Sequence, residues 1–329
     1  MSAVVHDHYG PLNQLRVREI PIPTIAAGQI LVRVHAASLH AGDCMCVKGS
    51  PGIVRIATGL FRPKNRVPGF DVAGVVDAVG KDVTHFQPGD QVFGTCEGAC
   101  ADYAVVEEDR LALKPTTLSL QEAAAVPTSG LAALHGLRDA GQLLPGQDIL
   151  INGAAGGVGH FAVQIAKSYG ARVTGVCSAG NADMVLGLGA DQVLDYHTQD
   201  FAADGARFDV IFDNVENRDL ADCRAALKER GTYIANSGTG ATGLRFLVRL
   251  FKPLLLSPFI RQTLKRYVSI TTRRDLECLK DLIDAGKLRP VIGNTFTLAE
   301  VPDALALIDT GHSRGKSIIN LKTPGPQVE

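Results

Sequence analysis

The stretch Asp148-Ile149-Leu150-Ile151-Asn152-Gly153-Ala154-Ala155-Gly156-Gly157-Val158-Gly159 decides the fold of this chain. Its apolar start predicts a β-strand, its small residues predict a tight turn, and the helical spacing of apolar residues after Val158 predicts a helix. Glycines at such a turn let backbone N–H groups and a positive helix end approach a phosphate. Although Ala154 replaces the first glycine of G-x-G-x-x-G, the turn is expected to bind the diphosphate of a dinucleotide through Gly153, Ala154, Ala155, Gly156, Gly157 and Val158.

Further strands and helices extend this unit in both directions. Residues 171–177 and 208–213 predict two more strands, and helices alternate with strands to about residue 286, which favours a parallel doubly wound sheet. Before residue 121, short β runs broken by Pro and Gly predict an all-β block, with strands at residues 30–35, 74–79 and 91–93. After the alternating part, Thr297 as N-cap and Glu300 predict a helix to residue 308, and residues 316–321 predict a strand that returns to the first domain.

Composition sets broad limits. A chain of 329 residues is long enough for about two domains, and a net charge of −1 gives no reason to expect nucleic acid as a partner. The N-terminal residues lack a basic region followed by an apolar run, and no apolar run is long enough to span a bilayer, so we expect a cytoplasmic protein. In that compartment the seven cysteines are expected to be thiols.

Five motifs, in this order along the chain, carry a resemblance to a known family. They are Pro68-Gly-Phe-Asp-Val-Ala-Gly-Val-Val76, Pro88-Gly-Asp-Gln-Val-Phe-Gly94, Ala125-Val-Pro-Thr-Ser-Gly-Leu-Ala-Ala133, Asn152-Gly-Ala-Ala-Gly-Gly-Val-Gly159 and Leu188-Gly-Ala-Asp191. The chain resembles the medium-chain dehydrogenase/reductase superfamily, and most closely its zinc-independent quinone oxidoreductase branch. The resemblance implies an α/β protein with a GroES-like β-barrel domain (residues 1–121 and 290–329), an inserted Rossmann domain (residues 122–289), an active site in the cleft between them, and a homodimer.

The resemblance also bears on a metal. Zinc-dependent members carry Gly-His-Glu where this chain has Gly69-Phe70-Asp71, and their cysteine ligand aligns near Ala41 or Gly42. Two of about three ligands needed for a catalytic zinc are therefore missing, and we expect no metal. A four-thiolate site built from Cys44, Cys46, Cys96 and Cys100 stays open as an alternative to ordinary thiols.

The expected cofactor is NADPH. Residues 176–181, where an NAD enzyme usually presents an acid to the ribose, contain none, and Ser178 and Asn181 can donate hydrogen bonds to a 2′-phosphate. Relatives often carry a basic residue where this chain has Gly180, which weakens this preference. Tyr196 matches a tyrosine of quinone reductases, and the resemblance assigns further cofactor contacts to Thr128, Asn214, Val215, Ser237, Gly238 and Lys316.

The expected reaction follows from the charge that hydride transfer creates. In the absence of a Lewis acid, hydrogen-bond donors or a proton must stabilise the acceptor oxygen, and quinones and enones spread that charge themselves. His40 stands where the family has an asparagine near the substrate. It either donates a proton or replaces the amide hydrogen bond. Asp43 is expected to orient the loop and Phe70 to form an apolar wall.

Several interpretations stay open. The chain is expected to reduce a quinone or an activated alkene, but oxidation of an alcohol and a non-enzymatic NADPH-binding or sensing role are alternatives. The basic and apolar segment 244–268 is interpreted as a lid of the substrate cleft or a dimer contact, with an anionic membrane surface as the less favoured partner. Residues 47–66 are interpreted as a mobile rim of the active site.

Overall fold

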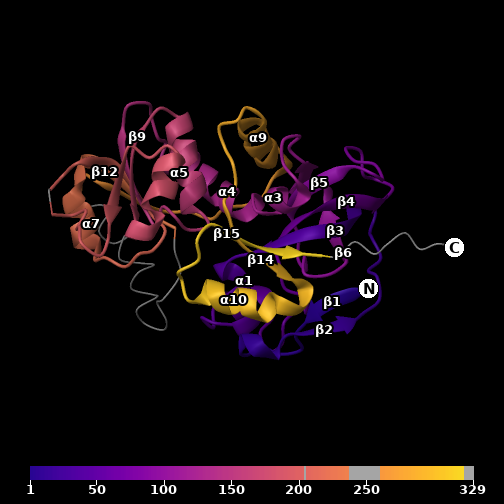
Figure 1. Cartoon of the computed structure of the whole chain (residues 1–329). Helices are drawn as coiled ribbons and strands as arrows, with labels where there is room; N and C mark the ends of the chain where they lie inside the picture. Colours follow the sequence, from indigo (N-terminus) through magenta and orange to yellow (C-terminus); the bar gives the residue numbers. More distant parts are fainter. Residues whose placement is uncertain (204, 237–259, 322–329) are drawn as a thin grey trace. The chain divides into compact units, whose positions relative to one another are not determined.

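The computed structural model describes residues 1–203, 205–236 and 260–321 (Figure 1). These residues form two compact units. The first unit contains Met1–Thr128, Thr271–Gly286 and the chain from Pro290 onward, and the second contains Ser129–Ile270 with Lys287–Arg289. The domain boundaries expected after residues 121 and 289 stay a prediction. None of the helices in the described ranges is both long enough and apolar enough to cross a bilayer.

The second unit is built on a six-stranded parallel sheet. Along the sheet the order is β10-β9-β8-β11-β12-β13, so the strands follow the sequence as 3-2-1-4-5-6. That order is the Rossmann order, and it confirms the predicted fold class. The strands are β8 (Asp148–Asn152), β9 (Arg172–Cys177), β10 (Gln192–Asp195), β11 (Phe208–Asp213), β12 (Leu227–Ala235) and β13 (Thr263–Arg266).

Helices pack against this sheet because their apolar faces match it. Helix α5 (Gly159–Ser168) lies alongside β8 and β9 and buries Phe161, Ala162 and Ile165 (Figure 1). A helix begins at Pro127, and from Gly136 to Ala140 it widens to a π-helix. The other described helices of this region are α4 (Pro127–His135), the π-helix Gly136–Ala140, the 3₁₀ turn Ala179–Asn181, α6 (Ala182–Gly187) and α7 (Leu220–Ala226).

The first unit is built on a sheet of order β14-β15-β3-β4-β5-β7, with β6 also paired to β3. Strand β15 (Lys316–Asn320) pairs antiparallel with β3 (Gln29–Leu39), which confirms that the closing segment returns to the first domain. Its core accordingly draws Val32 and Val72 from one part of the chain and Leu305 and Ile319 from another. The other strands are β1 (Ser2–Val5), β2 (Arg16–Glu19), β4 (Asp71–Val79), β5 (Gln91–Thr95), β6 (Tyr103–Glu107), β7 (Leu111–Leu113) and β14 (Ile292–Thr297).

The strands expected at residues 30–35, 74–79 and 91–93 are present within β3, β4 and β5, but the expectation that the block before residue 121 is all β was wrong. Helix α1 (Ala41–Lys48) forms there because His40 and Asp43 make a capping box at its start and Gly49, at φ 59°, ends it in the left-handed conformation. A short helix, α2 (Val54–Thr58), lies within the expected loop at residues 47–66. The remaining helices of this unit are the 3₁₀ turns Leu12–Gln14, Glu108–Arg110 and Leu298–Glu300, and α3 (Leu120–Ala124), α9 (Arg273–Asp284) and α10 (Val301–Asp309).

The capping box at Thr297 and Glu300 is present as predicted. The Thr297 amide and hydroxyl both donate to Glu300 Oε2, at 2.7 and 2.8 Å. The turn that follows is 3₁₀, however, and the α-helix begins only at Val301, where Pro302 is tolerated because the first turn needs no N–H at that position.

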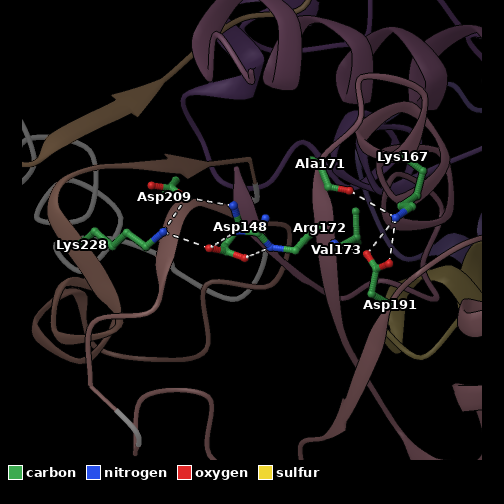
Figure 2. A network of polar contacts seen from close by, with 8 residues as sticks. All are labelled: Asp148, Lys167, Ala171, Arg172, Val173, Asp191, Asp209 and Lys228. Atoms are coloured by element: carbon green, nitrogen blue, oxygen red, sulfur yellow. Dashed lines mark hydrogen bonds and ion pairs between the residues drawn. The ribbon is translucent and has the colours of Figure 1, made fainter. Parts of the chain in front are cut away.

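Ion pairs join the amino ends of neighbouring strands in the second unit (Figure 2). Arg172 donates to both oxygens of Asp148, at 2.7 and 2.9 Å, and Lys228 bridges Asp148 and Asp209 at 2.9 and 2.8 Å. The hydrogen bonds from Arg172, followed by those from Lys228, lower the pKa of Asp148 to about 2. These contacts lie at the opposite end of the strands from the glycine turn. They are therefore expected to affect the stability of the fold and not the shape of the turn.

We predict that Asp148→Asn lowers stability by its full amount above about pH 4 and by progressively less between about pH 4 and pH 2. The native pKa of about 2 lies below the unfolded value of about 3.9, so the carboxylate stabilises the fold above the unfolded pKa and loses this effect as the pH falls through the native one. At pH 6 the expected fall in Tm is about 2 °C, because the group is partly solvated.

Thermal unfolding of both proteins from pH 2 to pH 7 measures this difference. Asp77→Asn, at an exposed position of β4, is the control with the same loss of charge. A Tm difference that stays constant across the whole range contradicts the prediction.

Candidate functional site

The glycine turn lies between β8 and α5 at the carboxyl edge of the parallel sheet. Gly153 has φ 75°, and a Cβ on Gly159 would lie 2.0 Å from the Gly153 carbonyl oxygen, so neither position accepts a side chain without strain. A Cβ on Gly156 would meet only the Gly153 oxygen, at 3.3 Å, so this side of the turn is open. Bare backbone is therefore exposed to a ligand where helix and strand pack closest.

The backbone amides of this turn divide into two sets. Those of Gly153 and Ala154 donate to Val176 O, at 3.1 and 2.9 Å, which ties the turn to β9. Within the described residues, no acceptor is assigned to the amides of Ala155, Gly157 and Val158. Amides without an acceptor at a helix start are the donors that bind phosphate oxygens.

A buried carboxylate holds the neighbouring strand end. Asn152 ends β8 and Asp213 ends β11, the two strands between which the order of the sheet reverses. Asp213 is fully buried and accepts hydrogen bonds from Asn152 Nδ2 at 2.8 Å and from Tyr233 Oη at 2.9 Å. Burial, followed by the charge of Asp213, raises the pKa of the Tyr233 phenol, which keeps its proton for this hydrogen bond. The edge of the sheet at this reversal is where doubly wound proteins bind ligands.

Asp213 also fixes the loop that follows β11. Its Oδ1 accepts the amides of Val215 and Glu216, at 3.0 and 2.8 Å. Glu216 has φ 54°, a conformation rare for a residue with a side chain, and its carboxylate pairs with Arg266 at 2.7 Å. The predicted cofactor residues Asn214 and Val215 therefore lie on a loop whose shape is set before any ligand binds.

Other predicted cofactor residues end the adjacent strands. Ser178 follows β9 and accepts a hydrogen bond from Asn181 Nδ2 at 3.0 Å, which leaves its own hydroxyl proton to donate. Tyr196 follows β10, is 42% exposed and contacts His197, with the ring planes inclined by 45°. Ser237 and Gly238, and most of the segment 244–268, lie outside the described residues, and part of the remainder forms strand β13.

In the first unit, Asp71 is the centre of a buried polar group. It is fully buried at the start of β4, where Oδ1 accepts both the amide and the hydroxyl of Thr128. The Lys316 ammonium lies 3.3 Å from Oδ2, and its side chain is only 2% exposed. Thr128 and Lys316, both assigned to the cofactor by sequence, thus both contact one buried carboxylate.

A second buried carboxylate, Asp43, lies on helix α1. Its Oδ2 accepts the His40 amide at 2.8 Å and its Oδ1 accepts the Gly69 amide at 3.0 Å. Burial raises the pKa of Asp43, whereas the hydrogen bond from the His40 amide acts in the opposite direction. These bonds hold the segment before Phe70 against the start of α1, as expected for a residue that orients the loop.

His40 and Phe70 lie together. Their rings stack with centroids 5.4 Å apart and planes inclined by 18°. His40 Nδ1 accepts the Gly42 amide at 2.9 Å, and Nε2 is buried with no hydrogen-bond partner among the described residues. The three predicted catalytic residues are therefore neighbours in the first unit, although their roles stay a prediction.

Sequence analysis missed Asp71, Asp213 and Gly42. A carboxylate at the start of the apolar run 71–76 was a usable signal for Asp71, because a buried acid needs donors. Asp213, the last residue of an apolar strand, gave the same signal. The role of Gly42 had no signal, because it depends on where the His40 ring lies.

The cysteines do not form a metal site. All seven are free, and no three His, Cys, Asp or Glu residues in the described ranges are placed to hold a metal ion. Burial raises the thiol pKa of Cys44 to about 12 and of Cys46 to about 11, so both stay protonated near neutral pH. The four-thiolate alternative is therefore wrong, because its members are not gathered.

The residues of the second unit fit a dinucleotide. The fit rests on the open side of Gly156, on the turn amides for which the described residues offer no acceptor, and on the hydroxyl of Ser178, which accepts from Asn181. These groups are donors, and all lie at the carboxyl ends of β8 and β9. Donors in this arrangement match the anionic oxygens of such a ligand.

Comparison with known proteins identifies relatives along nearly the whole chain. Residues 26–133 match the family described as alcohol dehydrogenase GroES-like domain, and residues 188–319 match zinc-binding dehydrogenase. The mouse (Mus musculus) mitochondrial NAD(P)H oxidoreductase RTN4IP1 is 32% identical, over 98% of this chain and 89% of the relative. The chloroplastic NADPH-dependent alkenal/one oxidoreductase of Arabidopsis thaliana is also 32% identical, over 97% and 79%.

A solved structure gives the same result. The quinone oxidoreductase from Coxiella burnetii has 31% sequence identity and a TM-score of 0.84, with 98% of this chain and 99% of that chain covered. The relatives thus share both units of the fold. The chain therefore belongs to the medium-chain dehydrogenase/reductase superfamily, in which its relatives include quinone oxidoreductases.

Proposed function

We propose that this protein is an NADPH-dependent reductase that delivers hydride to a quinone or an activated alkene. The observation that carries the proposal is the bare glycine turn beside the strand reversal of the sheet, with amide donors that have no assigned acceptor in the part of the chain that the structure describes. Relatives named as NAD(P)H oxidoreductase, alkenal/one oxidoreductase and quinone oxidoreductase support the reaction class.

The cofactor would be held by residues of the second unit. The amides of Ala155, Gly157 and Val158 would bind its diphosphate, and Asn214 and Val215 would border it from the fixed loop. Asn214 is itself held, because its Nδ2 donates to Asn152 O at 3.1 Å and its Oδ1 accepts from Asn236 at 2.7 Å. When bound, the reduced nicotinamide supplies the hydride.

NADPH is favoured over NADH by the end of β9. Residues 178–181 carry no acid, and Ser178 and Asn181 already form a hydrogen-bonded pair of donors there. A 2′-phosphate gains hydrogen bonds from such donors, whereas the acid that NAD enzymes use would repel it. The NADPH-dependent relative agrees with this preference.

The acceptor class is supported by the first unit. Nε2 of His40 has no hydrogen-bond partner among the described residues, and the ring stacks on Phe70. A flat ring surface beside one polar group suits a planar conjugated carbonyl, which disperses the charge that hydride brings. The homodimer and the role of segment 244–268 as lid or dimer contact, rather than membrane surface, stay predictions.

We expect the purified protein to oxidise NADPH when a quinone or an enone is added. Turnover should be at least about 100-fold faster than with a saturated ketone, because only the conjugated acceptor spreads the developing charge. Stopped-flow absorbance at the nicotinamide band, with a panel of both classes, measures this ratio. Faster turnover with simple ketones or alcohols would establish the alcohol dehydrogenase alternative, and NADPH binding without turnover of any acceptor would establish the non-enzymatic one.

Ser178→Asp should weaken NADPH binding by about 10-fold or more and leave NADH binding equal or tighter, because a carboxylate would face the 2′-phosphate. Titration of nucleotide fluorescence gives both dissociation constants. Gln192→Glu adds the same charge at the amino end of β10 and should change neither. An unchanged NADPH affinity in Ser178→Asp would show that the 2′-phosphate does not bind at this strand end.

Lys316→Met should destabilise the protein by about 3 kcal/mol, because Asp71 would then be a buried carboxylate without its cation. The double variant Asp71→Asn, Lys316→Met should recover most of that loss. Chemical unfolding measures stability, and nucleotide titration of the double variant tests the cofactor role of Lys316. NADPH affinity equal to that of the unaltered protein would show that Lys316 acts only on the fold.

A further inference from the structure

The imidazole of His40 has its two nitrogens in different situations. Nδ1 accepts the backbone amide of Gly42 at 2.9 Å, which makes it the side-chain cap of helix α1. Its distance to Asp43 Oδ2 is 3.7 Å, too long for a hydrogen bond. Since an accepting nitrogen carries a lone pair, the proton of the neutral ring is on Nε2.

The other nitrogen therefore carries an N–H donor. Nε2 is buried, and among the described residues it has no hydrogen-bond partner. A buried donor without an acceptor is unfavourable, so a ligand whose acceptor reaches Nε2 gains a hydrogen bond that the protein itself does not supply among its described residues. The side chain as a whole is 21% exposed, so the ring lies at the border of the unit rather than in its core.

Three neighbours hold the ring in this orientation. Phe70 stacks on it, and Asp43 Oδ2 binds the His40 backbone amide at 2.8 Å, so the cap is fixed from both sides. Gly42 contributes by having no side chain. A Cβ on Gly42 would lie 2.6 Å from His40 Cε1 and 2.8 Å from Nδ1, so any larger residue displaces the ring.

We propose that His40 is a neutral Nε2–H donor to the carbonyl oxygen of the acceptor, with its tautomer fixed by the capping of α1. This inference rests on the proposed reductase function and specifies one residue of it. His40 is thus a hydrogen-bond donor that keeps its proton, and it differs from an imidazolium acid that gives its proton away. It also differs from a simple replacement for the amide of the family's asparagine, because the donor is Nε2, whereas Nδ1 already accepts the Gly42 amide.

The chemical step balances without a proton from His40. When hydride, with its two electrons, bonds to the acceptor carbon, the π electrons of the conjugated system move to the carbonyl oxygen. That oxygen, now negative, accepts a stronger hydrogen bond from Nε2–H. Water then supplies the proton that completes the reduction. The contribution of His40 is larger in the transition state than in the ground state, so it raises kcat more than it lowers KM.

Two substitutions at His40 separate the two nitrogens. His40→Asn keeps a short acceptor that can cap α1 but has nothing at the position of Nε2. We expect Tm to stay within about 1 °C and kcat to fall about 100-fold, with a smaller change in KM. His40→Gln can place an N–H near the position of Nε2 but loses the short cap, so Tm should fall by about 2 °C and kcat should fall less than in His40→Asn.

Gly42→Ala tests the orientation of the ring without changing it chemically. The new methyl group displaces the imidazole, while alanine favours the helix, so kcat should fall about 10-fold with Tm equal or higher. Gly28→Ala is the matched control, because a Cβ there meets nothing within 4 Å and both kcat and Tm should stay unchanged. Wild-type kcat in either His40→Asn or Gly42→Ala would overturn the proposal.

The position of the proton on the His40 imidazole can be measured independently of catalytic activity. Nitrogen-15 NMR of the histidine-labelled protein, assigned by the loss of one signal set in His40→Asn, should show a protonated Nε2 and an unprotonated Nδ1. A proton on Nδ1 would overturn the proposal even if the enzyme is active. If the protein reduces no quinone or enone, the proposed function is overturned. The NMR result then still shows which nitrogen of His40 carries the proton.

Discussion

A buried carboxylate needs hydrogen-bond donors or a cation around it, and this requirement determines the arrangement of loops and strand ends in both units of the protein. Asp71, Asp43 and Asp213 are each almost completely buried. Each is bound by N–H or O–H groups, and the partners of Asp71 come from positions as distant as Thr128 and Lys316. Leaving any of the three unpaired is costly in free energy, so these contacts select one arrangement of strand ends and loops.

The arrangement places fixed loops where ligands are expected. The loop after β11 is the clearest case, because Glu216 adopts φ 54° at a strain that its neighbours must offset. Its amide is bound by Asp213 and its carboxylate by Arg266. The loop thus keeps its shape through protein contacts alone, which is the property that lets a site bind without first paying to order itself.

The sequence predicted the elements whose signals are local. The strand, turn and helix at residues 148–168 follow from apolar spacing and glycines, and the parallel sheet follows from alternation. Helix α1 was missed because it buries only Asp43, Cys44 and Val47 and its cap is a histidine, which is not among the usual capping residues. The partners of Asp71 are up to 245 positions away, and no local pattern encodes such a distance.

The discontinuous first unit has a consequence for synthesis on the ribosome. Strand β3 emerges early in the nascent chain, but its neighbour β15 and the cation of Lys316 emerge near the end. Until then the Asp71 carboxylate lacks its cation. The edge of β3 that later pairs with β15 is also unpaired, and it can pair with a wrong strand. The inserted second unit has no such wait, because its described strands are consecutive in sequence. Translation thus imposes an order in which the nucleotide-binding half matures first and the last strand locks the other half.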